Sequence, residues 1–142
     1  MTDPSPDGPV VFDAEPLVAL FCDEPGSDAV ERHLLAVERG DSEGYVSEVN
    51  LAEVRYVVEA IGGPEESAAA VETLADSRIR WVGTGDTWKR AARYERRLSP
   101  ALGDAFALAT AEAVGGTLLA GPDDDYDDAS DVDVVRFRED PG

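Results

Sequence analysis

The chain has very few of the side chains that small enzymes use for covalent catalysis or zinc binding. Its 142 residues include one cysteine, Cys22, and one histidine, His33. A single cysteine excludes an intramolecular disulfide, and a histidine without a second histidine or cysteine as partner argues against a zinc site. The composition therefore disfavours chemistry that depends on a histidine base or a reactive thiol.

Long apolar runs are also missing, because no stretch of the sequence is apolar enough and long enough to span a bilayer. Residues 1–9 are polar and rich in proline, and they lack the basic segment and apolar centre of a secretory signal. We therefore expect a soluble, cytoplasmic protein without a membrane partner.

Positive charge is scarce as well. Lys89 is the single lysine, and 12 Lys and Arg stand against 31 Asp and Glu, for a formal charge of −19 and a pI near 4.1. Such a charge opposes binding to nucleic acid, because phosphate affinity rests on Lys and Arg displacing counterions. Molar salt would remove most of that repulsion, since the Debye length then falls to about 3 Å. Abundant acid with scarce lysine resembles the proteins of salt-in halophiles, so we expect a haloarchaeal origin.

The length and the hydrophobic content of 43% are sufficient for one domain with its own core. No linker rich in proline, glycine or serine divides the chain. We expect a polar tail at residues 1–8, one domain at residues 9–138 and a short tail at residues 139–142.

Strands and helices are expected to alternate along this domain. Short runs typical of strands occupy residues 9–12, 45–46, 79–82, 117–120 and 132–137. Helical periodicity occupies residues 15–21, 28–39, 50–61, 64–75, 87–98 and 104–114, with Ser27 or Asp28 and Asp86 as N-caps. The order predicts an α/β fold, a three-layer α/β/α sandwich with a central, mainly parallel sheet of about five strands. The larger apolar residues Tyr56, Ile61, Trp88 and Tyr94 are expected in the core.

Four acidic residues stand where apolar segments end or helices begin. They are Asp13, Glu53, Asp104 and Asp123. The carboxyl ends of parallel strands share one edge of a sheet, so we expect these side chains to converge there. Converging carboxylates repel one another, and a hard divalent cation such as Mg²⁺ or Mn²⁺ would relieve the repulsion. The pattern predicts a metal site suited to phosphodiester chemistry.

Four segments of the sequence resemble PIN-domain proteins of the VapC toxin type, in the order found in that family. They are VVFDAEPLVALFCDEPG, VSEVNLAEV, LSPALGDAFALATAEAVGGTLLAG and the following DDDY. The resemblance extends from about residue 10 to residue 137. It implies a PIN-like fold and a Mg²⁺- or Mn²⁺-dependent endoribonuclease that cleaves RNA. It also implies a cognate antitoxin as partner, as in type II toxin-antitoxin pairs, and a homodimer.

The resemblance also assigns the acidic residues. The catalytic and metal-binding acids are Asp13, Glu53, Asp104 and Asp123, with Asp125 as an auxiliary metal ligand and Tyr126 in the aromatic position of the motif. Gly121 stands where the family usually has threonine. Any acid of the run from 123 to 125 could be the fourth ligand.

Basic residues gather in one region, because seven of the 12 lie between Arg78 and Arg97. Lys89, Arg93 and Arg97 recur at helical spacing with Arg90 beside them, so these four residues are the candidate RNA contacts. The alternative is that they pair with acids on a solvated helix face.

Two other functions remain open from the sequence. Asp13 after a strand, followed by Glu15, loosely fits a phosphatase of the haloacid-dehalogenase type, although that motif requires aspartate at the second position. The missing threonine favours a second alternative, a PIN fold that binds RNA or protein with weakened catalysis.

Overall fold

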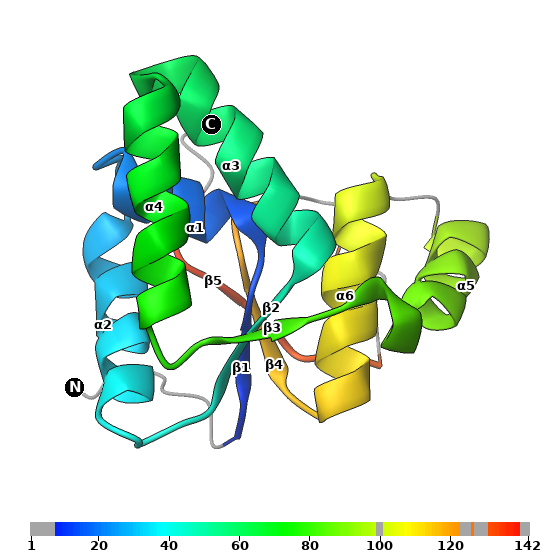
Figure 1. Ribbon diagram of the computed structural model, residues 1–142. Helices are drawn as coiled ribbons and strands as arrows, with labels where there is room; N and C mark the ends of the chain where they lie inside the picture. Colours follow the sequence, from blue (N-terminus) through cyan, green and yellow to red (C-terminus); the bar gives the residue numbers. More distant parts are fainter. Residues whose placement is uncertain (1–7, 99–100, 123–125, 127–130, 140–142) are drawn as a thin grey trace.

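The computed structural model describes residues 8–98, 101–122, 126 and 131–139 (Figure 1). Five strands form one sheet in the order β3-β2-β1-β4-β5, and all four pairings are parallel. The strands are β1 (Val10–Phe12), β2 (Gly44–Ser47), β3 (Arg80–Val82), β4 (Thr117–Ala120) and β5 (Val134–Arg136). The predicted α/β fold with a parallel sheet of five strands is confirmed.

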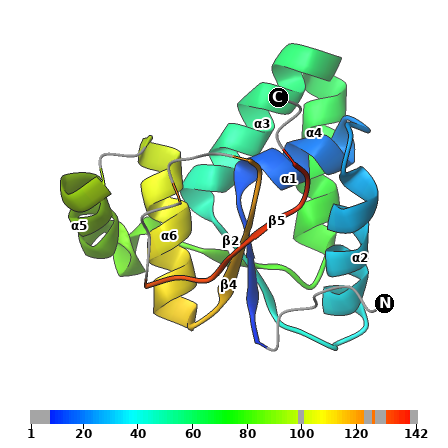
Figure 2. The ribbon, with the colours of Figure 1, turned by 180° about the vertical axis from the view of Figure 1, so that it is seen from behind.

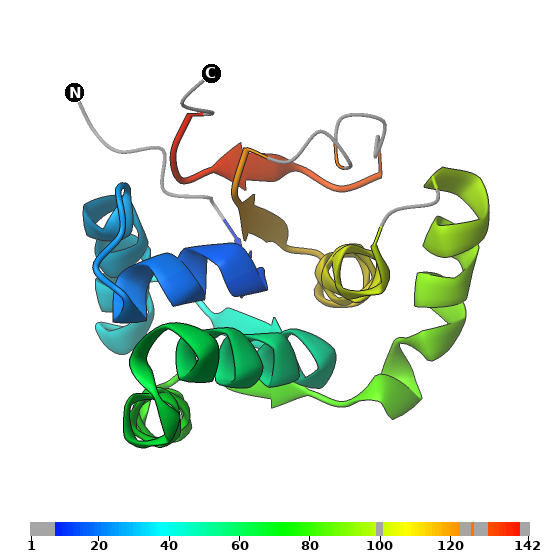
Figure 3. The same cartoon turned by 90° about the horizontal axis from the view of Figure 1, so that it is seen from above.

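Helices cover both faces of the sheet. They are α1 (Ala14–Phe21), α2 (Ser27–Glu38), α3 (Glu48–Gly62), α4 (Pro64–Asp76), α5 (Trp88–Leu98) and α6 (Leu102–Val114), with the short 3₁₀ helix η1 (Thr84–Asp86) before α5. Seen from behind and from above, α1 to α4 lie on one side, and α6 lies on the other with α5 outside it (Figures 2 and 3). None of the helices within the described ranges is both long and apolar enough to cross a membrane.

The central strand β1 shows why the sheet needs two helical layers. Val10 and Phe12 pack into a largely aliphatic core with α1 to α4, whereas Val11 packs into an alanine-rich core with α5 and α6. Successive side chains of a strand point to opposite faces, so a strand that is apolar throughout must be covered twice.

The first turns of α1, α3 and α6 meet above the carboxyl ends of β1, β2 and β4, near the centre of Figure 3. Helix α1 contacts α3, and α3 in turn contacts α6. The amino ends of helices carry partial positive charge and unpaired N–H groups, so this meeting point favours acidic side chains.

The start of α2 differs from the prediction. Its N-cap is Gly26, with φ 89°, rather than Ser27 or Asp28. A Cβ on Gly26 would lie 2.8 Å from the ring of Phe137. Both the left-handed backbone and the close approach of Phe137 therefore require glycine here.

Two further helix starts also differ. Asp86 ends η1 instead of capping α5, and the carbonyl of Thr87 accepts the first bond of α5 from the N–H of Ala91. Helix α3 starts at Glu48, two residues before the predicted start, because Ser47 caps it by accepting the N–H of Val49 at 3.1 Å. Glu53 therefore lies in the second turn of α3.

The predicted burial of large apolar residues is correct for one of four. Tyr94 is 1% exposed, but Tyr56 is 61%, Ile61 58% and Trp88 54% exposed. Helical periodicity identified the helices correctly, yet these three residues lie on faces that no described element covers.

Candidate active site

Asp13 directly follows β1 and begins α1. Its Oδ1 accepts the N–H of Ala14 at 2.8 Å, so the carboxylate is the N-cap of the helix. The side chain is 6% exposed. A strand that runs directly into a helix thus holds this carboxylate inside the protein, at the carboxyl edge of the sheet.

Asn50, which the motif analysis did not select, joins the acids. It is fully buried, and its Nδ2 donates to Glu53 Oε1 at 2.8 Å, to the carbonyl of Gly103 at 3.0 Å and, at 3.5 Å, to Asp13 Oδ1. Residues three apart share a helix face, which places Asn50 beside Glu53. One amide therefore links α3 to the starts of α1 and α6.

Gly103 and Asp104 lie in the first turn of α6. A Cβ on Gly103 would overlap the Glu53 carboxylate, so glycine is what allows α6 and α3 to approach here. The same close approach brings Asp104 to the edge where Asp13 and Glu53 lie.

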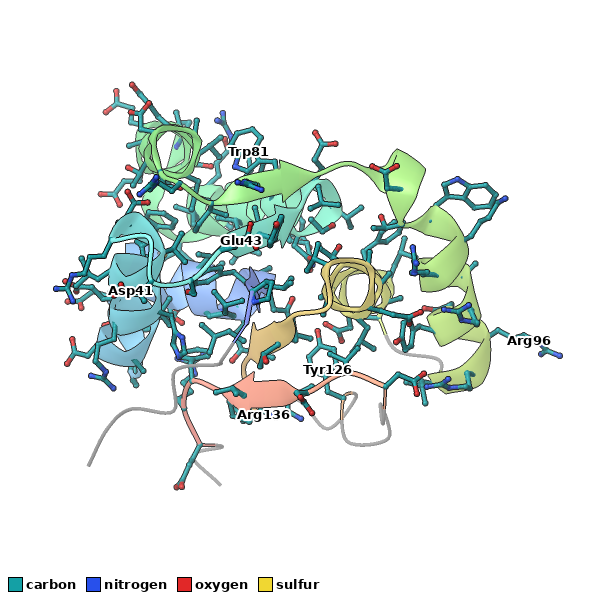
Figure 4. All side chains as sticks on the ribbon, turned by 90° about the horizontal axis from the view of Figure 1, so that it is seen from below. Asp41, Glu43, Trp81, Arg96, Tyr126 and Arg136 are labelled. Carbon is teal, nitrogen blue, oxygen red and sulfur yellow. The ribbon has the colours of Figure 1, made fainter. Side chains whose placement is uncertain are left out.

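Tyr126 completes the described part of the site. Its hydroxyl is within hydrogen-bond distance of Asp13 Oδ2 and lies 2.8 Å from Asp104 Oδ1. The guanidinium of Arg136 on β5 lies 5.4 Å from the centre of the Tyr126 ring and donates to the carbonyl of Gly121 at 2.6 Å. Figure 4 shows Tyr126 and Arg136 next to each other.

Two carboxylates of this edge, those of Asp13 and Glu53, have a raised pKa. Burial raises the pKa of Asp13 from 3.8 to about 7, with smaller upward contributions from the charges of Glu53 and Glu15 and downward ones from the bonds of Tyr126 and Ala14. Burial also raises the pKa of Glu53, against the bond from Asn50. Burial and the two neighbouring carboxylates raise the pKa of Tyr126 far above its ordinary value, so its hydroxyl stays protonated. The ionised forms of Asp13 and Glu53 are thus disfavoured in the metal-free protein, and a nearby cation would stabilise them.

The carboxylates at this edge offer oxygen atoms as metal ligands, and oxygen is the ligand type that Mg²⁺ or Mn²⁺ prefers. In the described ranges, however, no three Cys, His, Asp or Glu side chains lie close enough to hold an ion. Asp13 and Asp104 are bridged by the Tyr126 hydroxyl, and Asp13 and Glu53 by Asn50. The predicted ligands Asp123 and Asp125, and the alternative Asp124, lie outside the described residues.

The family model described as PIN domain matches residues 10–132. The chain belongs to the PIN domain family. This membership replaces the haloacid-dehalogenase alternative, and Glu15, which motivated it, forms an ion pair with Arg138 at 3.1 Å. The exact domain limits, 9 and 138, remain a prediction.

Solved structures of toxin-antitoxin proteins resemble this PIN domain. VapBC2 from Rickettsia felis bound to a promoter DNA fragment aligns with a TM-score of 0.73 and 13% identity, covering 90% of this chain and 98% of that chain. DNA-bound VapBC from Salmonella typhimurium aligns with a TM-score of 0.71 and 14% identity, covering 92% of this chain and 99% of that chain. VapC20 from Mycobacterium tuberculosis, a toxin that cleaves the sarcin-ricin loop, aligns with a TM-score of 0.68 and 17% identity. The alignment covers 85% of this chain and 95% of that chain.

At these identities the likeness concerns the fold, and the predicted resemblance to VapC-type PIN domains is confirmed at that level. A search of curated proteins finds no match. The predicted haloarchaeal origin finds no support in these comparisons.

The space around Gly121 explains why this PIN domain has glycine where threonine is usual. A Cβ at this position would overlap the carboxylate of Glu15, which Arg138 holds in place. Any larger side chain at position 121 would therefore displace Glu15 from its ion pair.

Most of the predicted RNA contacts on α5 have acidic partners. Arg93 lies 2.6 Å and Arg90 3.5 Å from Glu112 Oε1, and Arg97 lies 3.0 Å from Asp131 Oδ2. Lys89 instead lies over the exposed ring of Trp88, at 5.4 Å. Arg96, which flanks this basic stripe in the sequence, is exposed and points away from the protein (Figure 4).

A cavity of about 650 Å³ opens at the opposite, amino edge of the sheet. Its lining includes Asp41, Glu43 and Arg80, and Figure 4 shows the labelled acids at this end of the molecule. Ligands of parallel α/β sheets bind outside the carboxyl ends of the strands, so we assign this cavity no part in the acidic site.

Proposed function

We propose that this PIN domain is a metal-dependent endoribonuclease that hydrolyses RNA phosphodiester bonds, acting as the toxin of a type II toxin-antitoxin pair. The proposed ligands of Mg²⁺ or Mn²⁺ are Asp13, Glu53, Asp104 and Asp123, with Asp125 as an auxiliary ligand. The likeness to VapBC complexes supports a cognate antitoxin as partner. A homodimer remains a prediction.

The observation that carries the proposal is the meeting of three acids from separate segments at one edge of the sheet. Asp13 and Asp104 contact the same hydroxyl, and Asp13 and Glu53 contact the same amide. Within the described residues, the charges of Glu53 and Glu15 act on Asp13, and both raise its pKa. The ionised forms of Asp13 and Glu53 are disfavoured where they lie. Such a group suits a cation, because an acid with a purely structural role would be stabilised by pairing with a basic residue.

The residues of the site each supply one requirement of phosphodiester hydrolysis. A bound divalent ion would polarise the phosphate and acidify the attacking water. Asp13, fixed as an N-cap, provides an oriented carboxylate, and Asn50 holds Glu53 against the start of α6. The helix amino ends that meet here favour the negative charge of a phosphate.

RNA would approach along α5. The sequence proposes Lys89, Arg90, Arg93 and Arg97 as contacts, and the ion pairs of the last three weaken their attraction for phosphate. The exposed Trp88 ring beside Lys89 adds a surface on which an unpaired base can stack. Lys89 and Arg96 are therefore expected to contribute more to RNA binding than Arg93.

The experiment is cleavage of a labelled structured RNA in molar KCl with Mn²⁺ or Mg²⁺, with EDTA as one control. The unaltered chain is compared with Asp104→Asn and with Asp76→Asn, a matched change at an exposed acid at the end of α4, outside the site. We expect metal-dependent cleavage that Asp104→Asn abolishes and Asp76→Asn preserves. Cleavage that survives in Asp104→Asn would contradict the site.

One result would favour the alternative function, a PIN-fold binding module with weakened catalysis. In that result the unaltered chain and Asp104→Asn bind RNA equally well in a filter-binding assay, and neither protein cleaves it.

A further inference from the structure

One hydroxyl in the site faces two carboxylates. Tyr126 Oη lies within hydrogen-bond distance of both Asp13 Oδ2 and Asp104 Oδ1. A phenol has a single proton and can donate it to only one of the two oxygens at a time. Two carboxylates thus converge on a single donor, and a cation that bound them would compete with this donor for the same oxygen atoms.

The hydroxyl contacts one of the two carboxylate oxygens of Asp13. Asp13 Oδ1 already accepts the N–H of Ala14 and faces Nδ2 of Asn50. Oδ1 is therefore engaged in capping α1, whereas Oδ2 contacts the Tyr126 hydroxyl. An ion that approached Oδ2 would have to compete with this hydroxyl.

Tyr126 is held firmly in this position from behind. The side chain is 2% exposed, and its ring packs in the alanine-rich core. Arg136 stacks on the ring and also donates to the carbonyl of Gly121. The contact with the acids is therefore part of a packed arrangement, and moving the hydroxyl disturbs several neighbours.

We propose that the Tyr126 hydroxyl is a positioning group that takes the place of the cation between Asp13 and Asp104, and that the ion must displace it to bind. The proposal rests on the proposed metal site. On this account the hydroxyl stabilises the cation-free protein and lowers its cation affinity. It also explains why the described acids are bridged rather than gathered around one point.

The test compares Mn²⁺ binding by Tyr126→Phe and by the unaltered chain, using isothermal titration calorimetry and thermal unfolding. Phenylalanine keeps the ring and its stacking with Arg136 and removes only the hydroxyl. Tyr94→Phe is the matched control, because the buried Tyr94 hydroxyl donates to Glu112 at 2.5 Å, away from the site. Asp104→Asn measures ion binding by the other acids of this highly charged chain.

We expect Tyr126→Phe to bind Mn²⁺ about tenfold more tightly, which is the effect of one hydrogen bond to a charged group. Its cation-free melting temperature should fall, and its rise on adding Mn²⁺ should exceed that of the unaltered chain. Tyr94→Phe should melt lower with unchanged Mn²⁺ affinity.

Equal or weaker Mn²⁺ binding by Tyr126→Phe would overturn the proposal, since the hydroxyl would then be neutral toward the ion or support it. Failure of the metal site itself gives a different result. In that case the unaltered chain and Asp104→Asn would bind Mn²⁺ alike, whatever Tyr126→Phe does.

Discussion

Two clusters in this PIN domain each place a carboxylate against a buried tyrosine, but they surround that carboxylate with charges of opposite sign. The edge cluster consists of Asp13, Glu53 and Asp104 at the carboxyl edge of the sheet. The flank cluster consists of Glu112 with Arg90 and Arg93, where α5 packs on α6. In each cluster a buried tyrosine hydroxyl contacts a carboxylate.

Their pKa values shift in opposite directions. Burial raises the pKa of Asp13 and of Glu53. Burial also acts to raise the pKa of Glu112, but the bond from Tyr94 and the charges of Arg93 and Arg90 outweigh it and lower the pKa. Burial alone thus does not identify a functional acid. The informative feature is a buried carboxylate whose pKa the charges of neighbouring acids raise further, as Glu53 and Glu15 do for Asp13.

The largest expected effect is on RNA cleavage, which should depend on the edge cluster and not on the flank cluster. Glu53→Gln removes a proposed ligand, and because a metal ion supplies several kcal/mol of transition-state stabilisation, RNA cleavage should fall by about a thousandfold or more. Glu112→Gln makes the same chemical change in the flank cluster, and because it only releases Arg90 and Arg93 toward phosphate, it should not lower cleavage. Initial rates with saturating Mn²⁺ measure both. Comparable losses in the two variants would show that the clusters do not differ in function.

The next effect concerns stability and pH. The pKa of Asp13 is about 7 in the folded protein and 3.8 ordinarily. Between these values the unfolded chain has released the proton and the folded chain still holds it, so metal-free stability falls as pH rises from 4 to 7. The full loss is on the order of 4 kcal/mol. Urea unfolding at several pH values in EDTA measures it.

The control for this pH dependence is Asp13→Asn. Self-repulsion among the many other acids also weakens the fold as pH rises, and that contribution remains in the variant. The difference between the two pH profiles isolates Asp13. Parallel profiles would mean that Asp13 ionises as an ordinary acid.

A smaller effect should follow from Gly103→Ala. Alanine normally stabilises a helix interior, but here its Cβ would push aside the end of the Glu53 side chain. A flexible carboxylate can move, so the fold should survive while Mn²⁺ affinity falls by about tenfold, as for a disturbed neighbour of a metal ligand. Calorimetry measures the affinity.

Gly85→Ala is the matched change, because a Cβ there meets nothing within 4 Å. Mn²⁺ affinity should be normal in this variant. An equal loss of affinity in both variants would remove the role of Gly103 in placing Glu53.

The smallest effect should come from the flank cluster. Arg93 is 58% exposed at its side chain, so Arg93→Ala should cost about 1 kcal/mol or less and lower the melting temperature by about 2–4 °C. Differential scanning calorimetry measures the shift. The ion pair should weaken further in molar salt, and a shift that is unchanged by salt would point to lost packing instead.

The sequence was sufficient for the order of elements because apolar periodicity in this chain is strong. Residues 10–12 are apolar throughout and form a strand buried on both faces, and the alanine-rich stretch from 104 forms the helix that packs closely on the sheet. Helix starts were less predictable. Gly26 is an N-cap because Phe137, more than a hundred residues away, packs against it.

The acids could be selected from sequence, but the groups between them could not. Asn50 stands three residues before Glu53, a spacing that places both on one helix face and that could have drawn attention to it. Its bond to Gly103 depends on how α3 and α6 pack, which no local pattern contains. The ion pairs of Arg90 and Arg93 likewise depend on α5 lying against α6, so a stripe of basic residues did not reveal how many were available to RNA.

Asn50 has a consequence for the order in which the protein can become active. Its amide joins segments that lie 37 and 53 residues away from it along the chain. Tyr126 then bonds an aspartate 113 residues before it. A growing polypeptide on the ribosome therefore lacks this geometry until the segment that contains Tyr126 has emerged and docked. Any activity that depends on the site begins only after that point.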